Sequence, residues 1–114
     1  MKDYKLGEFE EVILLLVGIL GDDAYAYRIT DEYKSQSGRG ASIGTVHSTL
    51  ERLLEKGFVE SRMGEPGAGR GGRRKRIYSL TADGEQVLRA SRDFRVSLWN
   101  QLPGLSLDQL RFAW

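Results

Sequence analysis

The sequence contains no cysteine, and among its 114 residues it has only two prolines and one histidine. The absence of cysteine excludes disulfides, thiolate metal sites and a cysteine nucleophile. A single histidine without cysteine does not supply the ligand set of a zinc site. No nucleophile paired with a base can be assembled from the sequence either. We therefore expect no metal, no cofactor and no enzymatic activity.

The sequence also lacks an apolar run long enough to cross a membrane. Its longest run covers residues 12–20 and is flanked by acidic pairs on both sides, whereas a spanning helix needs about 20 apolar residues. No signal-peptide pattern precedes the run, because Asp3 and Glu8 stand near the start of the chain. We expect a cytoplasmic protein that makes no contact with a membrane.

Positive charge is concentrated in the middle of the chain, although the net charge is only +1. Residues 1–36 carry four basic and eight acidic side chains, residues 37–80 carry nine and four, and residues 81–114 carry four of each. A basic middle third indicates a local anionic partner. A solvated basic face is the alternative explanation.

Hydrophobic spacing predicts a first helix over Glu8–Leu20, which ends before Gly21. This helix is apolar nearly all round, so we expect it to be buried on more than one side, in part by a second chain. A second helix is predicted over Ala24–Gln36, with Asp22 and Asp23 as capping candidates.

The third predicted helix begins at the capping candidate Ser42 and ends at Gly57. One side carries an apolar stripe of Ile43, Val46, Leu50, Leu53 and Leu54. The opposite side carries small and polar residues, namely Gly44, Thr45, Ser48 and Arg52, with His47 at the flank of the stripe. A smooth polar face of this kind fits a major groove, although an ordinary solvent-exposed face would look similar.

Two β segments are predicted next, over residues 58–63 and 74–80, joined by the glycine-rich stretch 64–72. Basic residues gather at and beside this tip, namely Arg70, Arg73, Arg74, Lys75 and Arg76. A thin, arginine-bearing loop can follow a minor groove. The glycine pattern of residues 67–72 also resembles a dinucleotide-binding loop, but no helix is predicted after it.

A fourth helix is predicted to begin after Thr81 and to end at Pro103 and Gly104. Its apolar stripe consists of Val87, Ser91, Phe94 and Leu98, flanked by Leu88 and Trp99. In a monomer this stripe would be exposed, so we expect it to pair with a second copy of the chain. Residues 105–114 could add a short last helix.

The order of three helices and a hairpin with a basic tip predicts a mainly α fold with a small β-hairpin, a winged helix-turn-helix with a C-terminal dimerisation helix. We assign residues 1–80 to a DNA-binding domain and residues 81–114 to a dimerisation helix and tail. The expected function is sequence-specific binding of double-stranded DNA in transcriptional regulation. A module for protein or RNA contacts stays open as an alternative.

The sequence resembles the PadR-like transcriptional regulators. The resemblance rests on Leu6-Gly-Glu-Phe-Glu10, on Gly21-Asp-Asp-Ala-Tyr25, on the run from Ser42 to Val59, and on Gly71-Gly-Arg-Arg-Lys75 followed by Tyr78-Ser-Leu-Thr-Ala-Asp-Gly84. It covers about residues 6–90. It implies a dimeric regulator, usually a repressor, whose C-terminal helix packs against the partner's C-terminal and first helices.

The predicted site residues follow from the pattern and the resemblance together. For DNA we expect Ser42, Gly44, Thr45, His47, Ser48, Arg52, Arg70, Arg73, Arg74 and Lys75, and for dimerisation Leu16, Val87, Leu88, Ser91, Phe94, Leu98, Trp99 and Leu102. His47 departs from the family, in which tyrosine is frequent at this position.

Some members of the family bind flat aromatic molecules between their C-terminal helices. The resemblance therefore implies a small-molecule effector as a further possible partner, with Phe94 and Trp99 as candidate ligand contacts. Arg95 aligns with the ligand-stacking position, so we interpret Phe94 and Trp99 mainly as dimer-packing residues.

Overall fold

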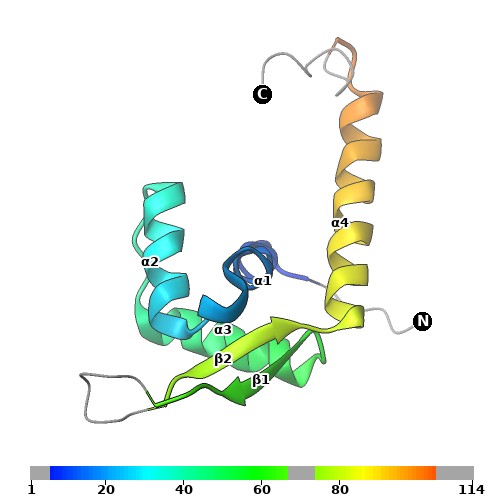
Figure 1. Ribbon diagram of the computed structural model, residues 1–114. Helices are drawn as coiled ribbons and strands as arrows, with labels where there is room; N and C mark the ends of the chain where they lie inside the picture. The colour runs from blue at the N-terminus through cyan, green and yellow to red at the C-terminus, as the bar shows by residue number, and fades with distance from the viewer. Residues whose placement is uncertain (1–5, 67–73, 105–114) are drawn as a thin grey trace.

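The computed structural model describes residues 6–66 and 74–104 of the chain. In these residues it contains four α-helices and one antiparallel hairpin (Figure 1). The elements in order are α1 (Glu8–Leu20), the 3-10 turn η1 (Gly21–Asp23), α2 (Ala26–Ser37), α3 (Ile43–Glu55), β1 (Val59–Met63), β2 (Arg76–Leu80) and α4 (Ala82–Gln101). The predicted mainly α winged-helix fold, with an additional C-terminal helix, is confirmed.

Two of the predicted helix caps are present. The backbone N–H of Thr45 donates to Ser42 Oγ at 3.0 Å, and that of Gly84 donates to Thr81 Oγ1 at 3.0 Å. The predicted caps of the second helix are wrong, because Asp22 and Asp23 lie in η1 and Tyr25 occupies the N-cap position without a side-chain bond. The 3-10 turn delays the start of α2 to Ala26.

The core lies where α1, α2, α3 and the hairpin meet. Its buried apolar residues are Ile13, Leu14, Leu16, Val17, Ala24, Ile29, Val46, Leu50, Leu53, Phe58, Val59 and Tyr78. Two expectations are corrected here. Leu16, predicted at the dimer interface, is only 5% exposed and lies inside the chain's own core, whereas Leu15 and Ile19 are the large apolar residues of α1 that are exposed. Ile43, predicted in the apolar stripe, is 48% exposed because it lies at the edge of the buried face.

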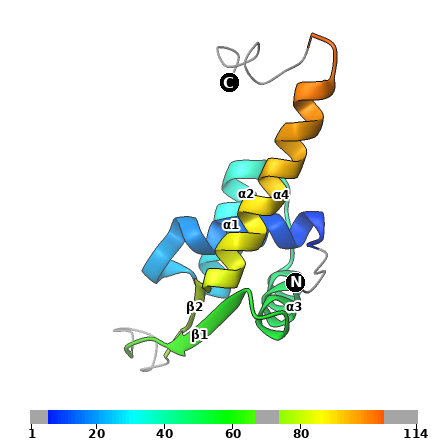
Figure 2. The same cartoon turned by 90° about the vertical axis from the view of Figure 1, so that its right-hand side faces the viewer.

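The hairpin directly follows α3 and is fixed to it. Gly57 turns the chain with a φ of +79°, and the Phe58 N–H donates to the Leu53 carbonyl at 2.9 Å. The strands pair in antiparallel register from Val59 opposite Leu80 to Met63 opposite Arg76, so both are shorter than predicted. In two perpendicular views the hairpin and α3 lie at one end of the molecule (Figures 1 and 2).

Helix α4 is attached to the body through its first turn. Thr81 donates its hydroxyl to the Gly57 carbonyl at 2.6 Å and its N–H to the Phe58 carbonyl at 3.1 Å. Gly84 lies so close to the same Phe58 carbonyl that an added Cβ would collide with it. The distal half of α4 extends away from the body on the side opposite the hairpin (Figure 2), and the helix ends at Gln101, shortly before Pro103.

None of the helices in the described part of the chain is both long and apolar enough to span a membrane. The stretch 105–114, over which the sequence allows a short last helix, lies outside the described residues.

Candidate nucleic-acid interface

The outward face of α3 is formed by small and polar side chains. Buried Val46, Leu50 and Leu53 hold the opposite face in the core. The predicted residues at its N-terminal end are all exposed, namely Ser42, Gly44, Thr45, His47 and Ser48. A Cβ added at Gly44 would find Ser42 Oγ as its nearest neighbour, at 3.9 Å. The helix can therefore approach a flat surface closely at this end.

The predicted site did not include two glutamates that lie on the same outward face of α3. Glu51 and Glu55 are exposed and continue the row of Gly44 and Ser48 at helical spacing. Glu51 Oε1 lies 3.7 Å from Nε2 of His47. In the sequence, Gly44, Ser48, Glu51 and Glu55 are separated by four, three and four residues. This helical spacing could have shown that the two glutamates share a face with the smaller residues.

Arg52, predicted to contact DNA, is also directed toward α1. Its Nε lies 3.5 Å from Glu10 Oε2, and its Nη2 donates to Thr49 Oγ1 at 3.2 Å. The side chain is still 53% exposed. Arg52 is therefore held in place by two neighbours at the rim of the α3 face.

Glu10 connects the end of α3 to the start of α1. Its carboxylate accepts from Lys56 Nζ at 2.8 and 2.9 Å and from the N–H of Gly7 at 2.8 Å. Burial by itself raises the pKa of Glu10, but the bonds from Lys56 and Gly7 and the charges of Lys56 and Arg52 hold it below its usual value. Glu10 is therefore ionised at neutral pH and fixes the orientation of α3.

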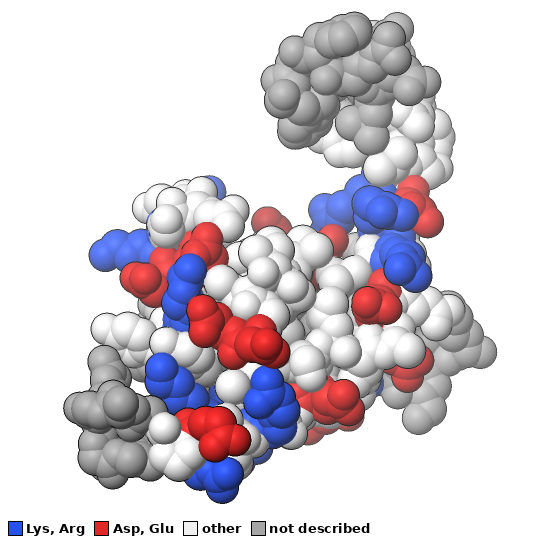
Figure 3. Space-filling model, in the orientation of Figure 1, with Lys and Arg blue, Asp and Glu red and all other residues white. Residues whose placement is uncertain are grey.

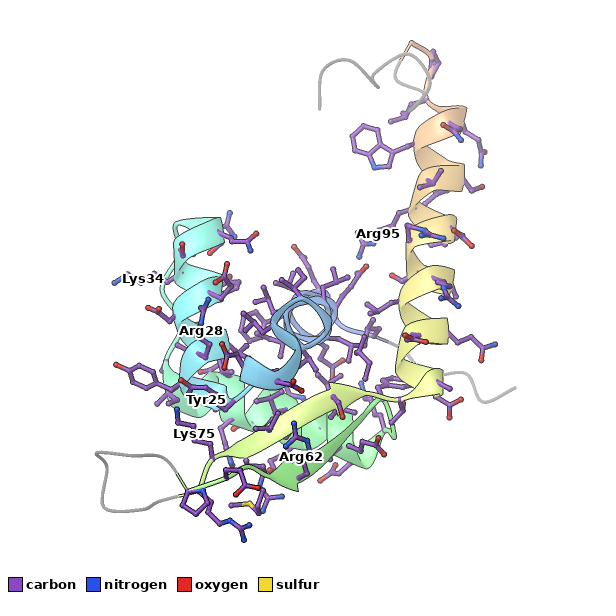
Figure 4. The ribbon with its side chains drawn as sticks, in the orientation of Figure 1. Tyr25, Arg28, Lys34, Arg62, Lys75 and Arg95 are labelled. Carbon is purple, nitrogen blue, oxygen red and sulfur yellow. The ribbon has the colours of Figure 1, made fainter. Side chains whose placement is uncertain are left out.

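The base of the wing is held against α2. Lys75 Nζ lies 4.1 Å from the centre of the Tyr25 ring (Figure 4), a cation–π arrangement. Arg74 Nε donates to the Gly64 carbonyl at 3.1 Å, which joins the two arms of the hairpin beyond the paired strands. Both cations are exposed. The other two predicted wing residues, Arg70 and Arg73, lie outside the described residues.

The surface around the hairpin is of mixed charge rather than uniformly basic. Figure 3 shows lysine and arginine side chains among acidic ones over the lower half of the molecule. Arg62, for example, binds Asp22 at 3.2 Å across β1 and η1. Arg76, the next residue after the two wing cations, donates to Ser61 Oγ at 3.0 Å.

Apolar side chains are exposed along α4, on a separate part of the molecule. Phe94 is 65% exposed, and Leu98, Trp99 and Leu102 are exposed as well. Val87 and Leu88 pack partly against the chain's own core, and Ser91 is half-buried. The predicted dimerisation residues on and just after α4 thus divide into a proximal group that packs partly against the body and a distal group of exposed side chains.

A groove of about 450 Å³ lies between α1 and α4. It is lined by Glu11, Leu15, Leu88, Arg89, Arg92, Arg95, Val96 and Trp99. Arg95 Nη2 reaches across from α4 and lies 3.2 Å from Glu11 Oε1 (Figure 4). Of the two candidate ligand contacts, Trp99 lines the groove and Phe94 does not. Within the described residues there is no group of three or more acidic or histidine side chains that could hold a metal ion.

The sequence matches the model of the transcriptional regulator PadR-like family over residues 14–90. No curated protein matches it. Among solved structures, the chain is similar to Bacillus subtilis PadR in complex with operator DNA, with 24% identity and a TM-score of 0.61. That similarity covers 76% of this chain and 48% of the Bacillus chain, so this chain spans about half the length of that relative.

Two further structures are similar over nearly their whole length. The smu.1704 protein of Streptococcus mutans has 24% identity and a TM-score of 0.66, covering 90% of this chain and 92% of its own. A PadR family transcription regulator of Clostridium difficile has 25% identity and a TM-score of 0.59, covering 80% of this chain and 95% of its own. These likenesses agree with the winged-helix fold described above.

Proposed function

The chain belongs to the transcriptional regulator PadR-like family, and from this premise we propose that it is a sequence-specific, dimeric DNA-binding repressor. In this proposal residues 1–80 bind DNA, and residues 81–114 join two copies of the chain. The observation that carries the proposal is the joint position of α3 and the hairpin at one end of the molecule, where a single duplex can touch both (Figures 1 and 2).

Helix α3 would lie in the major groove. Ser42, Gly44, Thr45 and Ser48 are exposed and small, so the backbone can come close to base edges and phosphates without a steric clash. His47 and Arg52 flank this face and can donate to phosphate oxygens. Recognition of a DNA sequence requires a rigid helix. The buried residues beneath α3 hold the helix in a fixed position.

The wing, residues 64–75, would follow the adjacent minor groove. Its arginines Arg70, Arg73 and Arg74 and its lysine Lys75 carry positive charge, and its glycines add no side-chain bulk. The contact of Lys75 with Tyr25 supports this assignment, because it fixes the base of the wing relative to the helices.

The homodimer is supported by the exposed apolar residues of α4 and α1. Phe94 and Leu98 on α4 and Leu102 directly after it are exposed, as are Leu15 and Ile19 on α1. Exposed apolar surface of this kind favours association with a second copy. Two protomers related by a twofold axis would present their α3 helices to successive major grooves about 34 Å apart, and repression would follow from occupation of the promoter.

A small-molecule effector is a second element of the proposal, supported by the groove between α1 and α4. The groove combines the apolar side chains of Leu15, Val96 and Trp99 with the arginine side chains of α4. A molecule bound there would contact both helices. If it favoured another angle of α4, the spacing of the two α3 helices would change and DNA affinity would fall.

The proposal is tested by selection of genomic fragments on the immobilised protein, with the promoter of its own gene included. We expect enrichment of a few promoter sequences with twofold symmetry. Affinity for them should fall with salt, with a log–log slope of about −0.9 for each phosphate contacted. Equal capture of all fragments, or a preference for RNA over duplex DNA, would contradict a sequence-specific repressor.

A further inference from the structure

The outward face of α3 carries a negative charge at its centre. Gly44, Ser48, Glu51 and Glu55 follow one another at spacings of four, three and four residues and are all exposed, so they form one row along the helix. Buried Val46, Leu50 and Leu53 occupy the opposite side. Glu51 is therefore part of the surface that the proposed function brings against DNA.

A carboxylate in this position repels the DNA backbone. Duplex DNA carries about one negative charge per 1.7 Å of its axis, and the repulsion acts on every sequence alike. It is offset only where the carboxylate accepts a hydrogen bond from the duplex. Glu51 would otherwise weaken all binding by this face.

The major groove offers few donors to such a group. Guanine presents two acceptors there, and thymine presents one acceptor and a methyl group. Adenine presents an amino group beside the acceptor N7, and N7 would repel the second carboxylate oxygen. Cytosine presents its N4 amino group, and its own ring adds no acceptor beside that group, so a carboxylate can approach from the C5 side, away from O6 of the paired guanine. A carboxylate therefore discriminates in favour of cytosine.

The Glu51 carboxylate lies beside the imidazole of His47. His47 Nε2 lies 3.7 Å from Glu51 Oε1, one helical turn toward the N-terminus of α3. Both side chains are about half exposed, and within the described residues no ion pair ties Glu51 to another element. The carboxylate therefore lies near His47 on the helix surface and is open to a ligand.

We infer that Glu51 determines specificity by accepting a hydrogen bond from the N4 amino group of a cytosine in each half-site. The inference rests on the proposed DNA-binding function and adds to it the base that one side chain selects. The rival explanation is that His47 and Glu51 form only a surface pair that stabilises the helix.

Selection from a pool of random duplexes tests the inference directly. The parent protein should enrich cytosine at one position of each half-site, and Glu51→Ala should lose that preference while keeping the rest of the motif. Glu51→Gln should prefer adenine at the same position, because an amide can both donate to N7 and accept from the amino group. The discrimination should fall by about five- to a hundredfold in Glu51→Ala.

A cytosine analogue without the exocyclic amino group gives a second measurement. When it replaces the selected cytosine, the parent protein should lose affinity, and Glu51→Ala should bind both duplexes equally. Glu55→Ala is the matched control, because it removes the same charge from the next turn of the same row and should leave the cytosine preference intact.

The outcomes separate the role of Glu51 from the proposed function. A parent protein that enriches no motif would overturn the proposed function itself. A motif shared unchanged by the parent, Glu51→Ala and Glu51→Gln would leave the proposed function standing and overturn the role of Glu51. Circular dichroism of each variant establishes that it is folded, which is expected because the Glu51 side chain is exposed.

Discussion

Glu10 and Glu11 are adjacent in the first turn of α1, but they form ion pairs with two different helices. Glu10 accepts from Lys56 at the end of α3 at 2.8 Å, whereas Glu11 lies 3.2 Å from Arg95 in the middle of α4. The start of α1 therefore connects the helix proposed to read DNA with the helix proposed to form the dimer. The two contacts differ in burial mainly on the side of the base, because the Lys56 side chain is 28% exposed and the Arg95 side chain is 56% exposed.

We expect Glu10→Gln to lower the free energy of unfolding by about 1.5–3 kcal/mol, the range for hydrogen bonds to charged groups. The substitution removes the charge that Lys56 and Arg52 bind inside the fold. Urea unfolding at neutral pH measures the change. Glu8→Gln in the same helical turn is the control, and it should shift the midpoint far less because Glu8 is exposed.

The effect of Glu10→Gln should depend on pH. The folded-state pKa of Glu10 lies below its usual value, so its contribution to stability is complete above the unfolded-state pKa and is lost as the pH falls through the folded-state pKa. The stability difference between parent and variant should therefore shrink in acid. A difference that stays constant down to the acid transition would show that the charge of Glu10 plays no part.

Gly84→Ala should destabilise the fold, because the new methyl group would collide with the Phe58 carbonyl at the base of α4. Overpacking of this kind costs about 1–3 kcal/mol, although alanine is the better helix former. The thermal unfolding midpoint should fall accordingly. The exposed neighbour Glu85 provides the control, since Glu85→Ala should change stability by no more than about 0.5 kcal/mol.

Gly44→Ala should have opposite effects on stability and on DNA affinity. The added methyl group meets no close neighbour, and alanine in a helix is favoured over glycine by about 0.5–1 kcal/mol. If the backbone at Gly44 approaches DNA closely, the same methyl group will weaken binding of the selected promoter fragment. Calorimetry and gel-shift titration measure the two effects, and unchanged affinity would remove Gly44 from the interface.

Arg73→Ala combined with Arg74→Ala should weaken binding to all duplexes. It should also flatten the salt dependence by about 0.9 for each phosphate that the variant no longer binds. Arg89→Ala combined with Arg92→Ala is the matched control, since it removes two positive charges from α4. Fluorescence anisotropy at several salt concentrations supplies both slopes. A wing variant that binds like the parent at moderate salt would refute the wing assignment.

Leu98→Asp should convert the proposed dimer into monomers. Leu98 is half exposed in the protomer, so the substitution leaves the core of the chain untouched and introduces a charge only into the proposed seam. Light scattering gives the mass in solution. Ser97→Asp places the same charge on a neighbouring exposed position and should leave the dimer intact; a dimer that survives Leu98→Asp would exclude this part of α4 from the interface.

The hydrophobic periods of the sequence were sufficient to predict the helices, and the glycine-rich stretch between two short segments was sufficient to predict the hairpin, because these signals are local. The caps at Ser42 and Thr81 were predictable for the same reason. The start of α2 was not, since Asp22 and Asp23 are good capping residues and the 3-10 turn that absorbs them depends on how α1 meets α2.

The burial of α1 also depended on tertiary packing. Its apolar residues surround nearly the whole helix, so the sequence could not tell Leu16, which lies in the core, from Leu15 and Ile19, which are exposed. Contacts between distant residues, such as Glu10 with Lys56 and Lys75 with Tyr25, were likewise unpredictable. They depend on the angles at which the helices and the hairpin meet.

The only histidine of the chain is exposed at the flank of the outward face of α3. Its imidazole ring protons therefore give a single set of proton NMR signals that requires neither isotopic labelling nor assignment by mutagenesis. Because no cysteine is present, one introduced thiol elsewhere would accept a dye or spin label without side reactions. The unmodified chain thus contains a spectroscopic reporter at the surface proposed to meet DNA.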